Sequence, residues 1–132
     1  MTYIISIIVI ILDQLIKIII NNNFYIGKTI PIIQGIFHLT YVRNTGAGFG
    51  ILAGQRYLLI FIKIIVIIAI LFYRNKVKKN IYLDLSTGLI IGGACGNLID
   101  RILTGSVIDY LDFRIWPIFN LADSMVVIGS GI

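Results

Sequence analysis

The chain contains 132 residues, of which 58% are hydrophobic and 13% charged, and its mean hydropathy is +0.99. These values lie far outside those of soluble globular proteins and predict a single-domain integral membrane protein. The net charge of +5 does not indicate a nucleic-acid partner, because the positive-inside rule explains the cationic cluster between two apolar runs, Arg74, Lys76, Lys78 and Lys79.

The first predicted helix covers roughly residues 3–20, close to the about 20 apolar residues that a membrane span needs. It does not resemble a cleaved signal peptide, because no Lys or Arg precedes the apolar run and no A-x-A site stands before Asn21. Asp13 and Lys17 share one face of this helix and can neutralise each other. We favour a structural ion pair over a direct chemical role, because ionisable groups inside membranes usually pair.

The segment 24–50 predicts a small sheet outside the membrane. Residues 36–43 alternate weakly between apolar and polar side chains and include aromatic ones, which is typical of a short strand at the membrane interface. A glycine-rich turn follows, with glycines at Gly46, Gly48, Gly50 and Gly54. We therefore expect an extracytoplasmic β-cradle that leads into the second helix.

Two further spanning helices are predicted at 57–73 and 83–103, on either side of the basic loop 74–79. If that loop is cytoplasmic, the N-terminus is cytoplasmic too. The segments 21–56 and 104–118 then lie on the outer side of the membrane.

Polar residues inside these two helices have different expected roles. Lys63 is expected to snorkel or to fill a polar crevice, and it is given no place in the site. Asn97, Asp100 and Arg101 share one face near the outer helix end, where they could form a helix-end cluster that also holds a catalytic loop. The same helix carries glycines that allow a neighbouring helix to approach closely, Gly88, Gly92, Gly93 and Gly96.

A fourth helix is predicted at 119–132. From Asn120 to Ile132 it would measure about 20 Å, which is short of the roughly 30 Å hydrocarbon core. Either the chain is truncated or the helix stops within the membrane. The expected fold is thus a mainly α, four-helix membrane bundle with a small β-cradle and an apparently truncated last helix.

The candidate catalytic residues are Asp109, expected in the outer loop 104–118, and Asp123, expected at the start of the fourth helix. Two carboxyl groups brought close together cannot both ionise cheaply, so one keeps a proton while the other stays charged. Such a pair can take a proton from water and polarise a peptide carbonyl, as amide hydrolysis requires. Either residue alone could instead be a helix cap or an interfacial anion.

Other hydrolytic sites find less support in the sequence. No HExxH motif and no glutamate are present, and His38 is the single histidine, so no metal site is expected. A Cys95–His38 nucleophile pair remains a weaker alternative. Cys95 lies in an apolar helix pattern, and a buried structural thiol is the better interpretation.

Five motifs of this chain together resemble the lipoprotein signal peptidase family, also called signal peptidase II. They stand in the order typical of that family and cover nearly the whole chain. The motifs are Asp13-Gln14-Leu15-Ile16-Lys17, the glycine-rich run Asn44 to Gly50, the run Gly92 to Arg101, Val107-Ile108-Asp109, and Phe119-Asn120-Leu121-Ala122-Asp123.

The resemblance implies a bacterial inner-membrane aspartyl endopeptidase that needs no cofactor. It would remove signal peptides from diacylglyceryl-modified prolipoproteins by cutting just before the lipidated cysteine, with membrane lipid around it. Its active site would lie at the extracytoplasmic face of this multi-pass protein. A globomycin-type inhibitor would be expected to bind.

Roles for individual residues follow from the same resemblance. Asp109 and Asp123 would form the catalytic dyad. Asp112 matches no family position and is interpreted as a surface acid, and Gly48 stands where the family usually has alanine. The residues expected to position the substrate or the dyad, or to support the architecture, are Asn44, Asn97, Arg101, Asn120, Asp13, Lys17 and Asp100.

Two other functional classes remain open at this point. A small four-helix transporter or channel subunit could use Asp13, Lys17 and Asp123 as a proton or cation relay. Such a protein would need an essential charge near mid-membrane and short outer loops. A non-catalytic assembly scaffold would tolerate the loss of both candidate aspartates.

Overall fold

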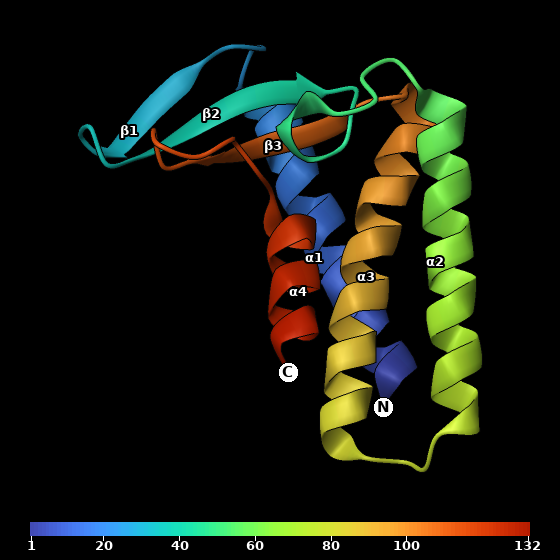
Figure 1. The fold of residues 1–132 in the computed structure, drawn as a ribbon. Coiled ribbons are helices and arrows are strands. Elements are labelled where there is room, and N and C mark those ends of the chain that lie inside the picture. Colours follow the sequence, from blue (N-terminus) through green and yellow to red (C-terminus); the bar gives the residue numbers. More distant parts are fainter.

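The computed structural model describes residues 1–132 and shows a helical bundle with a small sheet lying across one end (Figure 1). The expectation of a mainly α-helical chain with a small sheet is confirmed. The helices are α1 (Thr2–Asn23), α2 (Arg56–Lys76), α3 (Ile81–Thr104) and α4 (Leu121–Gly131). The strands are β1 (Thr29–Ile33), β2 (Phe37–Asn44) and β3 (Val107–Asp112), and a short 3-10 turn, η1, covers Gly48–Gly50.

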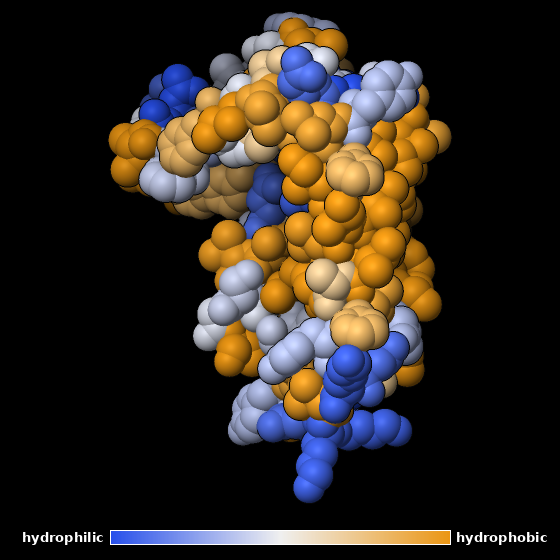
Figure 2. All heavy atoms as spheres, turned by 45° about the vertical axis from the view of Figure 1, so that its right-hand side comes forward, coloured by the Kyte–Doolittle hydropathy of each residue, from blue (hydrophilic) through white to orange (hydrophobic).

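Three of the helices, α1, α2 and α3, are long and apolar enough to cross a membrane. Hydrophobic side chains cover most of the helical surface, whereas hydrophilic ones gather at the end opposite the sheet, on parts of the sheet itself and in a hollow beneath the sheet (Figure 2). Helix α4 is shorter, and its 11 residues measure about 16 Å. It begins at Leu121 rather than at Phe119, because Asn120 caps its first turn with its side chain.

Helix α3 is the centre of the bundle, and its glycines bring α1 and α4 close to it. A Cβ atom added to Gly92 would lie 2.6 Å from Cβ of Val9 in α1. A Cβ atom added to Gly93 would lie 2.3 Å from the backbone oxygen of Ala122 in α4. The expected packing role of these glycines is therefore confirmed, since any larger side chain would push the helices apart.

Helix α2 stands at the edge of the bundle, beside α3 (Figure 1). Leu59 is its only buried residue, and most of its remaining surface is apolar and exposed. Such a surface is stable only in lipid or against another apolar partner. Contact with lipid does not account for a charged side chain on the side of α2 that faces the bundle.

The sheet is antiparallel, with strand order β1-β2-β3. Its third strand comes from the segment 104–118, where the sequence pattern indicated only a loop. The register pairs Val42 of β2 with Asp109 of β3. Tyr41, Ile108 and Tyr110 of the sheet pack with Ile20 near the end of α1, and this apolar cluster fixes the sheet to the bundle.

Candidate active site

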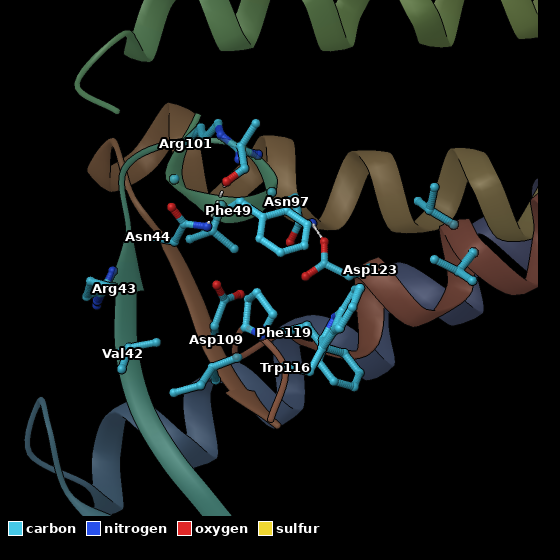
Figure 3. Close-up of a pocket in the computed structure, with 18 of the residues that line it drawn as sticks. Val42, Arg43, Asn44, Phe49, Asn97, Arg101, Asp109, Trp116, Phe119 and Asp123 are labelled. Atoms are coloured by element: carbon cyan, nitrogen blue, oxygen red, sulfur yellow. Dashed lines mark hydrogen bonds between the residues drawn. The ribbon is translucent and has the colours of Figure 1, made fainter. Parts of the chain in front are cut away.

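A cavity of about 560 Å³ opens where the sheet meets the helix ends, and both candidate aspartates line it. Its walls come from β2, the loop 44–50, α2, α3, β3, the loop 116–119 and α4. The carboxyl groups of Asp109 and Asp123 point into the same space (Figure 3). The structure thus brings together two acids that come from separate elements, β3 and the first turn of α4.

Asn120 joins the two aspartates and is itself completely buried. Its side-chain nitrogen donates to Oδ1 of Asp109 at 2.8 Å. Its side-chain oxygen accepts from the backbone nitrogen of Asp123 at 2.9 Å, and its own backbone nitrogen donates to Oδ2 of Asp123 at 3.2 Å. The last two bonds form a capping box, so the same contacts that begin α4 also orient Asp123.

Asn97 holds Asp123 from the opposite wall. Its side-chain nitrogen donates to Oδ1 of Asp123 at 2.7 Å. Its side-chain oxygen accepts from Nζ of Lys17 and from Nδ2 of Asn120, each at 3.0 Å. Because both donors meet the oxygen of Asn97, its NH₂ group is directed at Asp123. Each carboxyl group of the pair therefore receives a hydrogen bond from an asparagine.

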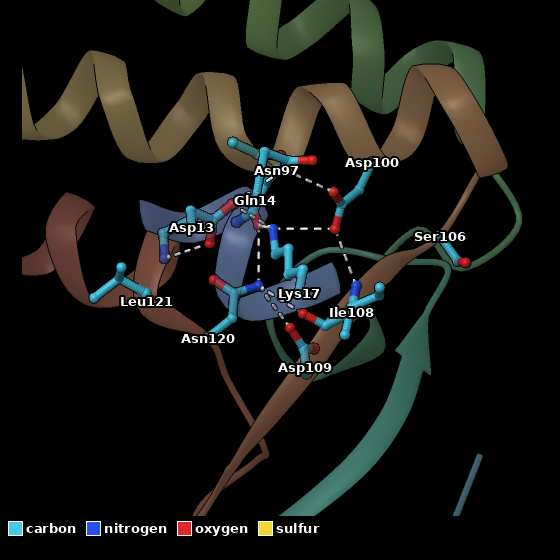
Figure 4. A network of polar contacts seen from close by, with 12 residues as sticks. Asp13, Gln14, Lys17, Asn97, Asp100, Ser106, Ile108, Asp109, Asn120 and Leu121 are labelled. Carbon is cyan, nitrogen blue, oxygen red and sulfur yellow. Dashed lines mark hydrogen bonds and ion pairs between the residues drawn. The ribbon is translucent and has the colours of Figure 1, made fainter. Parts of the chain in front are cut away.

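A buried ion network lies behind the two asparagines (Figure 4). Nζ of Lys17 is 2.7 Å from Oδ2 of Asp13 and 3.0 Å from Oδ2 of Asp100. The expected structural ion pair of Asp13 and Lys17 is therefore confirmed, and Asp100 completes it. All three residues are at least nine-tenths buried, so the ammonium group of Lys17 and hydrogen bonds from neighbouring groups stabilise the two carboxylates in place of water.

The same network anchors the two segments that carry the aspartates. The backbone nitrogen of Ile108, next to Asp109, donates to Oδ2 of Asp100 at 3.1 Å. The backbone nitrogen of Ala122, next to Asp123, donates to Oδ1 of Asp13 at 3.2 Å. The buried acids of α1 and α3 thus set the positions of β3 and α4 from one common point.

Burial and the nearby charge of Asp123 raise the pKa of Asp109 to about 7. The cation of Lys17 and the hydrogen bond from Asn120 act in the opposite direction without cancelling this effect. Asp109 is only 3% exposed, which makes its ionised form costly. Near neutral pH it therefore holds a proton for a substantial part of the time.

Arg101 and Asn44 occupy the wall of the cavity that is formed by the loop 44–50. Nη2 of Arg101 donates to the backbone oxygen of Gly46 at 2.9 Å, whereas Nε and Nη1 are buried without a hydrogen-bond partner. Asn44 uses its side chain within the loop, where it accepts from the nitrogen of Gly46 and donates to the oxygen of Ala47. Of these two residues, Arg101 is thus the one that has buried hydrogen-bond donors without partners.

The structure corrects two of the sequence-based expectations. Asp112 is not a surface acid: it is 5% exposed and accepts a hydrogen bond of 2.7 Å from Oγ1 of Thr40. Burial opposes its ionisation, but this bond and those from Arg114 hold its pKa below the usual range. Lys63 was given no place in the site, yet its side chain lines the cavity.

The sequence analysis also missed an aromatic pair at the cavity. Phe49 of η1 and Trp116 of the loop before α4 meet edge to face, with ring centroids 5.4 Å apart. Both rings line the cavity, and both are more than half exposed. Their only sequence signal was an aromatic residue in each of two loops, which does not reveal that the loops meet.

The alternative Cys95–His38 pair is not assembled. Both ring nitrogens of His38 have partners inside the sheet region, namely Oγ1 of Thr29 and the backbone nitrogen of Gly35. Cys95 lies in the middle of α3, a half-buried free thiol. No group of three or more His, Cys, Asp or Glu side chains is placed to hold a metal ion.

Comparison with known proteins gives consistent matches over the whole chain. A family model described as signal peptidase (SPase) II matches residues 5–132. The lipoprotein signal peptidase of Halothermothrix orenii is 58% identical over 132 residues, which are 100% of this chain and 91% of the relative. That of Clostridioides difficile is 49% identical over 133 aligned residues, with 98% of this chain and 90% of the relative covered.

Two solved structures share the fold, and each is described as a bacterial membrane enzyme determined by the in meso method. The structure at 2.3 Å resolution superposes with a TM-score of 0.93 at 38% identity and covers 98% of this chain and 82% of the other. The structure at 1.9 Å gives a TM-score of 0.89 at 38% identity, with coverages of 98% and 86%.

Proposed function

The chain belongs to the signal peptidase II family, as its motifs indicated, and from this premise we propose that it removes prolipoprotein signal peptides by aspartyl catalysis. Asp109 and Asp123 are the catalytic dyad in this proposal, and the substrates carry a diacylglyceryl group on the cysteine that follows the cut. The observation that carries the proposal is the pair of buried, asparagine-held carboxyl groups in one cavity, with the pKa of Asp109 at about 7.

The two aspartates take different parts in the proposed reaction. Asp123, the charged partner, accepts a proton from a water molecule, whose oxygen attacks the scissile carbonyl carbon. Asp109 gives its proton to the carbonyl oxygen, which becomes a hydroxyl group of the tetrahedral intermediate. Asp123 then gives its proton to the amide nitrogen as the C–N bond breaks, while Asp109 takes a proton back from a hydroxyl group of the intermediate as the carboxylic acid product forms, so the dyad regains its starting protonation state.

Arg101 supplies the remaining polar contact with the substrate in this proposal. Its Nε and Nη1 groups are buried without partners, and a buried donor without an acceptor costs about 1–3 kcal/mol. A backbone carbonyl of the substrate near the scissile bond satisfies them. Asn97 and Asn120 position the dyad, whereas Asp13, Lys17 and Asp100 hold the segments that carry it.

We also propose the orientation of the chain in a bacterial cell membrane. The basic residues 74–79 lie at the end of the bundle opposite the sheet (Figure 1), so the positive-inside rule places that end and the N-terminus in the cytoplasm. Helix α4 counts as the fourth membrane helix, and the cavity opens at the extracytoplasmic face. A globomycin-type inhibitor would occupy this cavity.

The transporter alternative has less support. The charged side chains inside the bundle cluster at the sheet end, around one cavity and its buried network. The rest of the bundle holds no comparable path of ionisable groups. Lys17, the cation of the buried network, is held by ion pairs with both Asp13 and Asp100, which does not suit a relay group.

The direct test is cleavage of a diacylglyceryl-modified prolipoprotein by the purified chain in detergent. We expect cleavage by the parent and a loss of at least about 100-fold in Asp109→Asn, because one half of the acid–base pair is gone. Asp112→Asn is the matched control, since it makes the same change in the same strand outside the cavity. Turnover retained in Asp109→Asn, or lost equally in Asp112→Asn, would contradict the dyad assignment.

A further inference from the structure

Lys63 is the one charged residue of α2 between Arg56 and Arg74, in a helix that is otherwise apolar along this length. It lies seven residues from the helix start, which places it about 10 Å from the sheet end of the helix. A charged lysine at this depth in lipid is costly. When it has no charged partner, it is a candidate for a functional role. No hydrogen bond or ion pair joins the side chain of Lys63 to any other residue of the chain.

The side chain of Lys63 is half-buried and lines the cavity that holds the dyad. The charged groups that act on its ammonium group are Arg101 and Asp123, and neither forms an ion pair with it. On the neighbouring wall the cavity is lined by Val126 and Val127 of α4. The ammonium group of Lys63 thus shares the cavity with apolar side chains of α4. An apolar helix can pack against these side chains.

The substrate supplies a group that fits this position. A signal peptide is an apolar helix, and at its C-terminal end the last four backbone carbonyl groups have no partner within the helix. The helix dipole adds partial negative charge at the same end. The helix must stop before the scissile bond, because the dyad needs that bond in an accessible, extended form, so these carbonyl oxygens reach the cavity just below Asp109 and Asp123.

We propose that Lys63 binds the terminal backbone carbonyl oxygens of the signal-peptide helix and thereby sets where that helix ends relative to the dyad. The ammonium group offers three donors on a flexible stem, which suits several carbonyl oxygens at the end of a helix. This role rests on the proposed function and deepens it, because it adds a substrate-positioning residue on α2 to the groups already described on α3, β3 and α4.

The test compares Lys63→Met with the parent on two substrates in detergent. One is a full-length diacylglyceryl prolipoprotein, and the other is a short diacylglyceryl peptide that keeps the residues around the cut but lacks the apolar helix. On the full-length substrate we expect KM to rise roughly 3- to 30-fold, the range of a cation at a helix C-terminus, with kcat changed less than about twofold. On the short peptide KM stays unchanged.

Two further variants sharpen the comparison. Lys63→Arg keeps the charge and should keep KM within about threefold of the parent. Lys76→Met removes a lysine at the other end of α2, where it lies over the ring of Phe72, and should leave both constants unchanged. In the inactive Asp109→Asn background, Lys63→Met should weaken binding of the full-length substrate by the same factor, a readout that does not depend on turnover.

Other results would overturn the proposal. An unchanged KM in Lys63→Met, or an equal rise on both substrates, would show that Lys63 does not contact the helix end. A shift of the pH–rate profile with KM unchanged would make Lys63 a counter-ion of Asp123 instead. If the parent cleaves neither substrate, the proposed function itself fails, which is a different outcome from cleavage that is indifferent to Lys63.

Discussion

Replacing Asp109 by Asn should make the protein more stable while it removes activity, and the gain in stability should depend on pH. The pKa of Asp109 in the folded chain is about 7, against 3.8 for an unperturbed aspartate. Below about pH 4 the carboxyl group is protonated in both the folded and the unfolded state, so it costs nothing. As pH rises from about 4 to about 7, the carboxyl group ionises in the unfolded chain first, and the folded state loses stability progressively.

The size of this effect follows from the pKa difference. A difference of about three units corresponds to about 4 kcal/mol in the free energy of unfolding, reached above about pH 7 and constant beyond it. The asparagine side chain of the variant has no charge to bury, and its amide oxygen can still accept a hydrogen bond from Nδ2 of Asn120. The variant should therefore escape most of this cost at alkaline pH and show little gain at acidic pH.

Thermal unfolding in detergent measures the effect, as the difference in Tm between Asp109→Asn and the parent at several pH values. We expect a difference near zero at about pH 4 that grows to about 10–20 °C at about pH 8. Taking the difference removes the contributions of titrating groups that do not interact with Asp109. A difference that is the same at both ends of this range would refute the buried, proton-holding state of Asp109.

Three other measurements test separate parts of the structure. Because the proposed mechanism needs the proton of Asp109, kcat/KM should fall about tenfold per pH unit above about pH 7, and a flat profile up to about pH 9 would contradict this. Gly92→Ala should lower stability by about 1–3 kcal/mol because its Cβ would lie 2.6 Å from that of Val9, as a fall in Tm would show. Gly48→Ala has open space around the new Cβ and should be neutral, so an equal loss in both variants would contradict the packing argument. EDTA should leave cleavage unaffected, whereas strong inhibition that zinc reverses would show a metal requirement.

The sequence predicted those features that depend on local pattern or on the cost of charge in an apolar chain. The spacing of Asp13 and Lys17 was enough to predict their ion pair, and the glycines of α3 were enough to predict close helix packing. The position of Asp109 and Asp123 near one predicted boundary suggested a shared site before any contact was known.

The remaining features depend on contacts between segments that are far apart in the chain. The six residues of β3 form a strand because β2 pairs with them, and a run this short in a predicted loop carries little signal of its own. Asp112 is buried because Thr40 and Arg114 meet it there. In the sequence, a single lysine in an apolar helix is explained equally well by snorkelling to the membrane surface and by a place in a functional site. Only the cavity that α2 forms together with α3 and α4 distinguishes the two interpretations.

The bond between Ala122 and Asp13 joins residues that are 109 positions apart, and it has a consequence for biosynthesis. A chain that is still being inserted into the membrane contains α1, with its acid and lysine, long before α4 exists. Until α4 docks, Asp123 lacks the hydrogen bond from Asn97, and Asp109 lacks the hydrogen bond from Asn120. In the proposed mechanism, the two aspartates are therefore not assembled as a pair during most of synthesis, and activity requires that α4 has docked.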